Sequence, residues 1–454
     1  MEEVVIVGGG LVGSLLSLFL AARGYAVRVF ERNPDPRTAG PSSGRSINLT
    51  LSHRGFAALS RAGVIDAVRA IAMPAYGRVI HGEDGGLAYQ PYGIHREALF
   101  SITRSDLNRV LLDIAAQTPG IEIRFRQKCV GLDGSAPAVI LEDLDSGQTS
   151  RERAGMIFGA DGAFSAVRLQ LQKTDRFDYS QEYIDQGYKE LSVPPPAVQA
   201  WGLDPEALHI WPRGRYMLIG FANFDGSFTL ALHLPYEGAP SFAAVRDESD
   251  LLRFFAHSFP DALPHIPNLV GDFFGRPVSS MLTVRCFPWV RGRVALLGDA
   301  AHAIVPSYGQ GANAGFEDCA VLDGCLERHG GDWDAALADF ERRRKPNADA
   351  IADLSLRHFR EIRDEVREPR FLLRKAVERR LDELYPGRFT PLYSLVSFTG
   401  MSYVEALERA REQEVVVDRL LAVSDLEERL ADANLGAALL QQVVGAAPGG
   451  RAGS

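Results

Sequence analysis

The stretch VVIVGGGLVGSLLSLFLAARGYAVRVFER, residues 4–32, decides the fold of this 454-residue chain. The β-branched run Val4–Val7 predicts a buried parallel strand. Gly8, Gly10 and Gly13 follow with the spacing G-x-G-x-x-G, which permits a tight turn, close approach of a pyrophosphate and close packing of a helix that begins near Leu11. The segment therefore predicts a Rossmann-type α/β fold.

The second half of this stretch indicates a nucleotide. Ala26–Phe30 predicts a second strand, and Glu31 at its end is placed to accept hydrogen bonds from a ribose hydroxyl. Phosphate oxygens would meet the free N–H groups at the helix start. A glycine-rich turn without a ligand is the alternative, but strand, glycines, helix, second strand and acid are all present. We therefore expect an ADP moiety here.

A second glycine-rich motif, GDAAHAIVPSYGQGANAGFEDC, spans Gly298–Cys319. It follows the apolar run Arg293–Leu297, which predicts another buried strand, and Asp299 is suited to hold the ribityl hydroxyls of a flavin. A helix over Ala312–His329 would direct its N-terminus at the isoalloxazine ring and stabilise negative charge there. The two motifs together predict one bound flavin. We assign catalytic roles to Pro306, Tyr308, Gly309 and Gln310, and cofactor contacts to Gly311, Ala312 and Asn313.

Two further segments carry candidate cofactor contacts. Ser101–Asn108 opens a helix whose Arg104 could reach a flavin phosphate or hydroxyl. Gly159–Arg168 follows an apolar run and would place Asp161 near the cofactor, although a lone Asp-Gly is usually only a turn. The expected cofactor contacts also include Arg32 and Arg45.

Composition narrows the class of protein. The chain is 46% hydrophobic with a net charge of −9, which supports large cores and argues against nucleic acid as a partner. Its four cysteines show no C-x-x-C spacing, so we expect neither metal nor disulfides. Acidic residues precede the apolar N-terminus, and the run Leu435–Val444 is too short to span a bilayer. We expect a cytoplasmic enzyme without a membrane span.

The separation of the two motifs makes the FAD-binding domain discontinuous. We assign to it residues 1–75, 97–177 and 270–330. Alternating apolar and polar residues predict an inserted antiparallel sheet that binds substrate. This sheet domain takes residues 76–96 and 178–269. Helical spacing of Ala, Leu, Glu and Arg predicts a C-terminal helical region over residues 331–445, followed by a disordered tail over residues 446–454.

The order GGGLVG, RSDLN, GADGAFS and GDAAHAIVPSYGQGANAG resembles the single-component, FAD-dependent aromatic hydroxylases. Five further segments are similar to the kynurenine 3-monooxygenase group of that family. They are GRSINLTLSHRG (44–55), QPYG (90–93), FDYSQEYIDQGYKEL (177–191), LHIWPRG (208–214) and KPNADAIADLSL (345–356). The similarity extends from the start of the chain to about residue 420.

The resemblance implies an activity. In such enzymes NADPH, or NADH, reduces FAD, and dioxygen forms a C4a-hydroperoxyflavin that hydroxylates an aromatic ring beside an electron-donating group. For kynurenine this group is the ring amine and the product is 3-hydroxylated. Because the cofactor carries the hard chemistry, the protein positions the ring and excludes water. We accordingly interpret His302 as a structural residue.

The resemblance also implies a substrate site. Arg78, Tyr92 and Tyr393 match the positions that bind the substrate carboxylate, which would be costly to bury unpaired. Taken alone, Arg78 would more often be a solvated surface residue and Tyr92 a packed strand tyrosine. Their joint presence favours the binding role.

This chain departs from the family at three positions. His358 replaces a customary Asn in the substrate site, where it can still donate a hydrogen bond. Ser307 replaces a bulky aromatic residue and Ala312 replaces Met, which enlarges the pocket. The substrate is therefore expected to be an aromatic amino acid, either kynurenine or a ring-substituted kynurenine. Another aminoaryl or phenolic acid, or a dehydrogenase or oxidase that inserts no oxygen, remains an alternative. The sequence leaves the nicotinamide site and the oligomeric state open.

Overall fold

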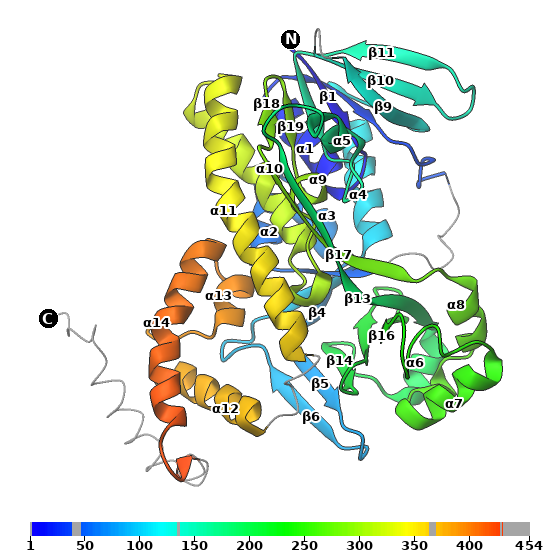
Figure 1. Cartoon of the computed structure of the whole chain (residues 1–454), viewed down its shortest axis with the longest axis vertical. Coiled ribbons are helices and arrows are strands. Elements are labelled where there is room, and N and C mark those ends of the chain that lie inside the picture. The colour runs from blue at the N-terminus through cyan, green and yellow to red at the C-terminus, as the bar shows by residue number, and fades with distance from the viewer. Residues whose placement is uncertain (1, 39–46, 134–136, 363–368, 427–428, 430–454) are drawn as a thin grey trace, which may run out of the picture.

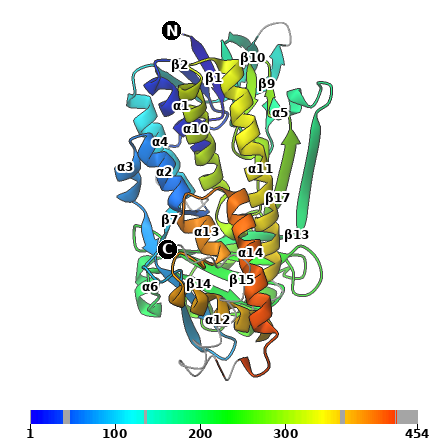
Figure 2. The same ribbon diagram turned by 90° about the vertical axis from the view of Figure 1, so that its left-hand side faces the viewer.

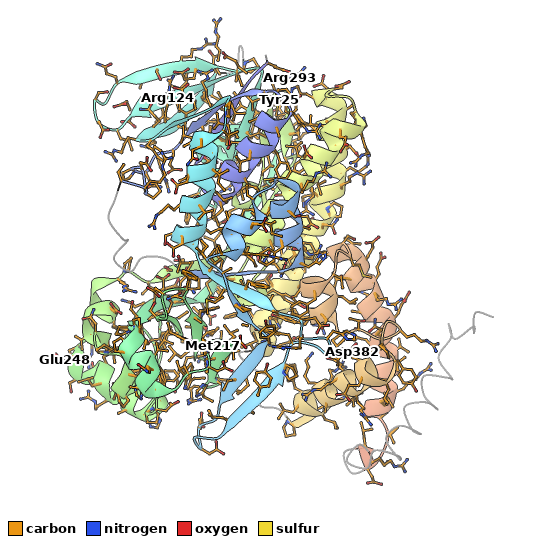
Figure 3. All side chains as sticks on the ribbon, turned by 180° about the vertical axis from the view of Figure 1, so that it is seen from behind. Tyr25, Arg124, Met217, Glu248, Arg293 and Asp382 are labelled. Atoms are coloured by element: carbon orange, nitrogen blue, oxygen red, sulfur yellow. The ribbon has the colours of Figure 1, made fainter. Side chains whose placement is uncertain are left out.

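A computed structural model describes residues 2–38, 47–133, 137–362, 369–426 and 429. Figure 1 shows an elongated molecule whose upper part surrounds β1 (Glu3–Val7). Its lower part holds a sheet on one side and the C-terminal helices on the other. In the view from behind, Glu248 and Asp382 mark these two sides (Figure 3). The predicted Arg45 and the tail 446–454 lie outside the described residues.

The upper part is built on a six-stranded sheet, whose order is β18-β19-β12-β1-β2-β8. Every pairing in it except β18 with β19 is parallel. Helices cover both faces of this sheet, so side chains on both sides of each strand are buried. This is why its strands are continuous apolar runs. The predicted β1, helix α1 (Leu11–Ala22) and β2 (Ala26–Phe30) are confirmed. The other strands are β8 (Ile121–Arg124), β12 (Met156–Gly159), β18 (Val290–Arg291) and β19 (Val294–Leu296).

Helices and two small sheets complete this part. Helices α1, α4 (Arg104–Gln117) and α10 (Gly311–Arg328) pack beside one another over the sheet. A three-stranded sheet lies at the top of Figure 1, formed by β9 (Gln127–Asp133), β10 (Ala138–Asp143) and β11 (Thr149–Arg153). A second one faces the lower part and contains β3 (Asn48–Leu51), β7 (Leu99–Thr103) and β4 (Met73–Ala75). The short helices are α2 (His53–Arg61), α3 (Ile65–Arg69), α5 (Ala166–Leu171) and α9 (Asp299–His302).

The predicted inserted sheet is confirmed as seven strands in the order β17-β13-β16-β15-β14-β5-β6. Only β14 and β5 pair in parallel. The strands are β5 (Gly77–His81), β6 (Leu87–Pro91), β13 (Asp178–Val193), β14 (Ala207–Pro212), β15 (Met217–Ala222), β16 (Phe228–Pro235) and β17 (Ser279–Phe287). A hydrophobic core lies between this sheet and α6 (Pro195–Trp201), α7 (Glu248–Ser258), η1 (Leu263–His265) and α8 (Leu269–Gly275).

One boundary differs from the sequence-based division. Strand β17, which we placed with the FAD-binding segments, pairs with β13 in the seven-stranded sheet. Helix α8 also packs on β13. An apolar alternating run shows that a strand forms but not which strand it joins. Strands β13 and β17 extend together from the lower part toward the upper one and thereby connect the two (Figure 2).

The C-terminal region is helical as predicted, as far as the described residues reach. Helix α11 (Trp333–Arg360) runs beside α10 and then along the lower part, where it contacts η2 (Pro306–Tyr308) and α14 (Tyr403–Leu421). Helices α12 (Pro369–Leu384) and α13 (Leu392–Phe398) pack on α14. Among the described helices, none has the length and apolar character needed to cross a membrane.

Candidate active site

The first glycine loop has the shape that a pyrophosphate requires. Gly8 adopts φ +106°, and a Cβ there would lie 2.5 Å from the carbonyl oxygen of Ala160. A Cβ on Gly13 would lie 1.9 Å from the Gly8 oxygen, so α1 can approach the strand only without a side chain. A Cβ on Gly10, by contrast, would meet no atom of a described residue within 4 Å, and among the described residues no side chain caps α1. Open space at uncapped N–H groups fits a bound phosphate.

The acid at the end of β2 lies beside this loop. Glu31 Oε2 accepts a hydrogen bond from the N–H of Gly9 at 2.8 Å, and Oε1 accepts one from the N–H of Asn33 at 2.8 Å. These bonds hold the carboxylate between the glycine loop and the turn after β2. Arg32, the next residue, is exposed.

The second motif reaches the first through Val12 on α1. A Cβ on Gly298 would lie 2.8 Å from Val12 Cγ2, and a Cβ on Gly315 would lie 2.6 Å from the same atom. The two motifs therefore converge, as the sequence predicts. Asp299 begins α9 at this junction and is half-buried.

A buried ion-pair network fixes this junction. Asp318 on α10 accepts hydrogen bonds from the Gly298 N–H at 2.9 Å, His302 Nε2 at 2.6 Å and Arg344 Nε at 2.7 Å. Burial alone would raise the pKa of Asp318, but His302 and Arg344 hold the pKa at about 2. These contacts agree with the interpretation of His302 as a structural residue.

The GADGAFS segment supports the same junction from the other side. Asp161 accepts hydrogen bonds from Ser165 Oγ at 2.5 Å and from the Ala166 N–H at 2.6 Å, so it holds the start of α5, whose N-cap residue is Ser165. Arg168 Nη1 donates to the Ala300 carbonyl at 2.8 Å and anchors α9. The described contacts of the Asp161 carboxylate are thus with its own loop. Farther away, the exposed Arg104 begins α4.

The loop before α10 is held against β3. Gly309 adopts φ +67°, and a Cβ on it would lie 2.1 Å from Thr50 Oγ1. Asn313 Nδ2 donates to the carbonyls of Thr50 and Gly309, both at 2.8 Å. The side chain of Gln310 is fully buried, and its Oε1 accepts a hydrogen bond from Tyr403 Oη at 3.0 Å. These contacts fix the position of the loop, and α10, whose N-cap side chain forms no capping hydrogen bond, follows it at Gly311.

Five side chains from distant segments form one polar aromatic cluster. The guanidinium carbon of Arg78 lies 5.2 Å from the ring centre of Tyr92 and 4.6 Å from that of Tyr393. The ring centre of Tyr308 lies 5.2 Å from that of Tyr393 and 4.7 Å from that of His358. The structure thus brings together Arg78, Tyr92, His358 and Tyr393, and adds Tyr308, which we had assigned to the flavin loop.

This cluster contains buried polar atoms that lack partners. Arg78 Nε and His358 Nε2 form no hydrogen bond with any described residue, and the polar neighbour of the Tyr92 hydroxyl is the Arg78 guanidinium. No described carboxylate forms an ion pair with Arg78, although two phenols beside it hold its pKa above the ordinary value against the effect of burial. Burial raises the pKa of Tyr92, which therefore stays neutral. Buried polar groups are rarely left unpaired in proteins, so the cluster fits an anionic ligand.

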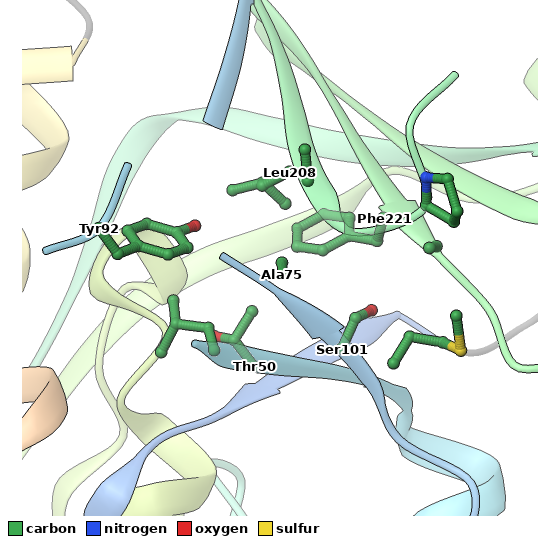
Figure 4. Close-up of a pocket in the computed structure, with 11 residues that line it drawn as sticks. Thr50, Ala75, Tyr92, Ser101, Leu208 and Phe221 are labelled. Atoms are coloured by element: carbon green, nitrogen blue, oxygen red, sulfur yellow. The ribbon is translucent and has the colours of Figure 1, made fainter. Parts of the chain in front are cut away.

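An apolar cavity adjoins the cluster. With a free volume of about 10 Å³, room for about one water molecule, it lies between the β3-β7-β4 sheet and the seven-stranded sheet. Figure 4 shows Tyr92, Ala75, Leu208 and Phe221 around it. Leu208 pairs in register with Arg78, so both side chains project from the same face of the sheet. The apolar lining beside buried donors suits the chemistry of a ligand with an aryl ring and an acidic end, and side chains around the cavity must move to admit the ring.

The remaining predicted substrate residue, Ser307, has a different contact. Its hydroxyl donates to the Ser355 carbonyl on α11 at 2.6 Å and thereby joins η2 to that helix. Sequence reasoning also missed two residues. Tyr403 holds Gln310, and Glu361 lies 3.6 Å from His358 Nδ1. An acid three residues after a histidine on a helix was the available signal for the second.

The fold and both glycine loops define an FAD-binding α/β protein, and the family model for the FAD binding domain matches residues 1–355. Kynurenine 3-monooxygenase from Christiangramia forsetii is 43% identical over 429 residues, covering 94% of this chain and 96% of that one. The Myxococcus xanthus enzyme of the same name is 45% identical over 421 residues, covering 92% and 90%. The chain therefore belongs to the kynurenine 3-monooxygenase family.

A comparison with solved structures agrees on the fold. The tetrameric form of 2-methyl-3-hydroxypyridine-5-carboxylic acid oxygenase superposes with a TM-score of 0.66 at 23% identity. The match covers 81% of this chain and 94% of that one. At this identity the likeness shows the shared architecture alone.

Proposed function

We propose that this protein is a monooxygenase that hydroxylates the aromatic ring of L-kynurenine, or of a ring-substituted kynurenine, at the 3-position. The co-substrates are dioxygen and NADPH or NADH. The observation that carries the proposal is the buried Nε of Arg78, which has no described partner, beside an apolar cavity. The names of the relatives support the same substrate.

Bound FAD would supply the transfer of electrons from NAD(P)H and the activation of dioxygen. The open face at Gly10 and the uncapped starts of α1 and α10 support its placement between the two motifs. The N-terminus of α10 would stabilise negative charge on the ring system. We propose that the cofactor is held by Gly8, Gly10, Gly13, Glu31, Arg32, Arg104, Asp161, Asp299, Gly311, Ala312 and Asn313.

The substrate would lie across the cluster and the cavity. Arg78 binds its carboxylate with paired N–H donors, and the hydroxyls of Tyr92 and Tyr393 donate alongside. The aryl ring would enter beside Leu208 and Phe221 as the small cavity expands, and their apolar side chains would exclude water from the reacting carbon. Pro306, Tyr308, Gly309 and Gln310 form the rigid wall beside the flavin.

Small side chains in the loop favour a substituted ring. Ser307 is bound back to Ser355 and Ala312 ends at Cβ, so neither fills space toward the substrate. A matched series of kynurenine and its ring-methylated forms tests this point. A preference in kcat/KM for a methylated form is expected, and a strong preference for the unsubstituted compound would exclude it.

Isotopically labelled dioxygen tests the reaction class. The hydroxylated product is expected to contain one labelled oxygen atom, with one NAD(P)H consumed for each product formed. Product without label would show a dehydrogenase or oxidase. Turnover of other aminoaryl or phenolic acids but not of kynurenines would show a hydroxylase of another acid. The four cysteines are free and buried, which is consistent with the reducing cytoplasm that we propose as its location.

A further inference from the structure

One buried histidine of the seven-stranded sheet has a ring nitrogen without a partner. His233 lies on β16 and is 7% exposed, and its Nδ1 forms no hydrogen bond with any described residue. Other buried histidines of this chain are bonded. His81 Nε2 lies 2.9 Å from His209 Nδ1, and His302 Nε2 lies 2.6 Å from Asp318 Oδ2. Because buried polar groups are rarely left unpaired, the imidazole of His233 suits contact with a ligand.

The register of the sheet places His233 on the face that carries Arg78. His233 pairs with Met217 on β15, and Met217 pairs with Pro212 on β14. Side chains two residues apart on a strand share a face, so Pro212 shares its face with Leu208, which pairs with Arg78. Leu208 borders the apolar cavity in Figure 4. The imidazole and the guanidinium therefore project from the same side of the sheet, with β14 and β15 between their strands.

The surroundings of His233 connect the cavity with the flavin loop. On β14 and β15, the residues of this face are apolar, and they are Leu208, Ile210, Pro212, Met217, Ile219 and Phe221. On the other side of His233, the ring centre of Tyr188 lies 5.6 Å away. Tyr188 packs against a cluster that contains Val305, the residue just before η2. His233 thus adjoins both the apolar wall and the segment that leads into the loop proposed beside the flavin.

Burial sets the protonation of this imidazole. It lowers the pKa of His233 to about 4. The ring is therefore neutral at neutral pH and carries one N–H and one lone pair. With the proton on Nε2, the lone pair lies on Nδ1, which then accepts a hydrogen bond. A neutral acceptor suits a neutral donor, such as an aromatic amine.

We propose that His233 accepts a hydrogen bond from the ring amine of the substrate and thereby selects aminoaryl substrates over aryl substrates that lack the amine. The inference rests on the proposed function and deepens it at the aryl end. Arg78 would hold the carboxylate and His233 the amine, and two fixed points leave the ring one orientation in the site. The carbon beside the amine would then face the flavin loop. The movement of side chains that admits the ring would also open Nδ1 to the amine.

Binding to the FAD-loaded protein tests this selection without turnover. L-Kynurenine is compared by calorimetry with an analogue that lacks the ring amine but keeps the aryl ketone and the amino-acid end. The measured quantity is the ratio of the Kd of the analogue to the Kd of kynurenine. In H233L this ratio is expected to be about threefold to about tenfold smaller than in the wild type, as loss of one hydrogen bond predicts. The change should come from weaker kynurenine binding, with the affinity of the analogue kept within about twofold.

Two further variants separate the contact from folding. His233→Asn places an amide oxygen close to the position of Nδ1, so it should keep a larger ratio than H233L. Leu232→Met is the matched control, because Leu232 is the next residue on β16 but faces the core on the opposite side of the sheet. It is expected to alter neither affinity. H233L should melt at the same or a higher temperature, since it removes a buried polar atom without a partner, and if it melts lower, the H233N ratio decides.

Three outcomes would overturn the proposal. Unchanged affinities for both ligands in H233L would show that His233 does not touch the substrate. Equal weakening of both ligands in a folded H233L would show contact with a group that they share, such as the ketone. Failure of the wild type to bind either ligand would overturn the proposed function and this inference with it. The first two outcomes leave the proposed function intact.

Discussion

Arg78→Met removes the charge on which the proposed substrate site depends. In the structure this guanidinium is packed against two phenol rings, its Nε is buried, and no described carboxylate forms an ion pair with it. Its pKa stays above the ordinary value, so the side chain is charged throughout the accessible pH range. Methionine retains much of the apolar stem while it removes the charge and the N–H donors.

The expected magnitude follows from the cost of burying a carboxylate without its partner. Removing one member of a buried, hydrogen-bonded charge pair costs about 2 to 5 kcal/mol. At about 1.4 kcal/mol per tenfold, R78M should weaken kynurenine binding by about 30-fold to about 4000-fold. Arg78→Lys keeps the charge without the planar donor pair and should fall between wild type and R78M.

Titration of kynurenine against the flavin absorbance of the FAD-loaded protein gives the dissociation constant, and a thermal melt gives the stability. R78M should keep its FAD. It should unfold at the same or a higher temperature, because the substitution removes a desolvated charge that has no ion-pair partner and therefore destabilises the fold. Arg96→Met is the matched control, since Arg96 also lies over a tyrosine ring, at 4.7 Å from the centre of Tyr76, but is exposed. An R78M protein that binds kynurenine as tightly as R96M would refute this placement of the carboxylate.

Three more changes test the cofactor site and its support. Gly10→Ala should fold normally but lose bound flavin, because its methyl group enters the open space assigned to phosphate, whereas Gly13→Ala should lower the melting temperature because its Cβ meets backbone at 1.9 Å. Asp318→Asn should destabilise the protein by about 3 to 5 kcal/mol, measured by denaturant unfolding. The folded pKa of Asp318 is about 2, below the ordinary value of 3.8, so its contribution to stability is complete above pH 3.8 and is lost as the pH falls toward 2. The stability of D318N should therefore depend less on pH in this acidic range than that of the wild type. Tyr403→Phe removes the hydrogen bond to Gln310 and should cost about 1 kcal/mol of stability and shift the flavin absorbance, while an unchanged spectrum would show that Gln310 does not act on the cofactor.

Local patterns predicted the nucleotide-binding half because its signals are contiguous. The strand β1, the glycine turn and the helix α1 follow one another within residues 3–22. The periodicity of apolar residues and the turn-forming glycines are therefore enough to predict this unit. The approach of Gly298 to Val12 could also be predicted from the sequence, because each motif follows directly after a strand of the same sheet. By contrast, the partner of β17 depended on tertiary pairing with β13, which no local pattern encodes.

The substrate cluster could not be derived in the same way. Arg78 lies in an edge region of a sheet, where an arginine is ordinarily solvated, and only the resemblance pointed to it. Tyr393, more than three hundred residues farther along the chain, lies over its guanidinium. The contact between Glu361 and His358 was within reach of helical spacing, yet its consequence for the imidazole depends on Arg78 and Lys375 from other elements. Charge environments of this kind are properties of the assembled fold.

The cluster takes side chains from β5, η2, α11 and α13, so it exists only when the C-terminal helices are docked. The buried contacts that dock them also reach the flavin loop. Tyr403 on α14 donates to Gln310, and its ring lies 3.9 Å from the guanidinium carbon of Arg54, which pairs with Glu317 on α10 at 2.9 Å. Any loosening of α14 would therefore disturb the cofactor loop and the substrate cluster together. FAD should bind the state in which the C-terminal helices are docked and thereby stabilise that state by mass action. Added FAD should therefore slow hydrogen exchange in these helices, although they lie outside the glycine loops.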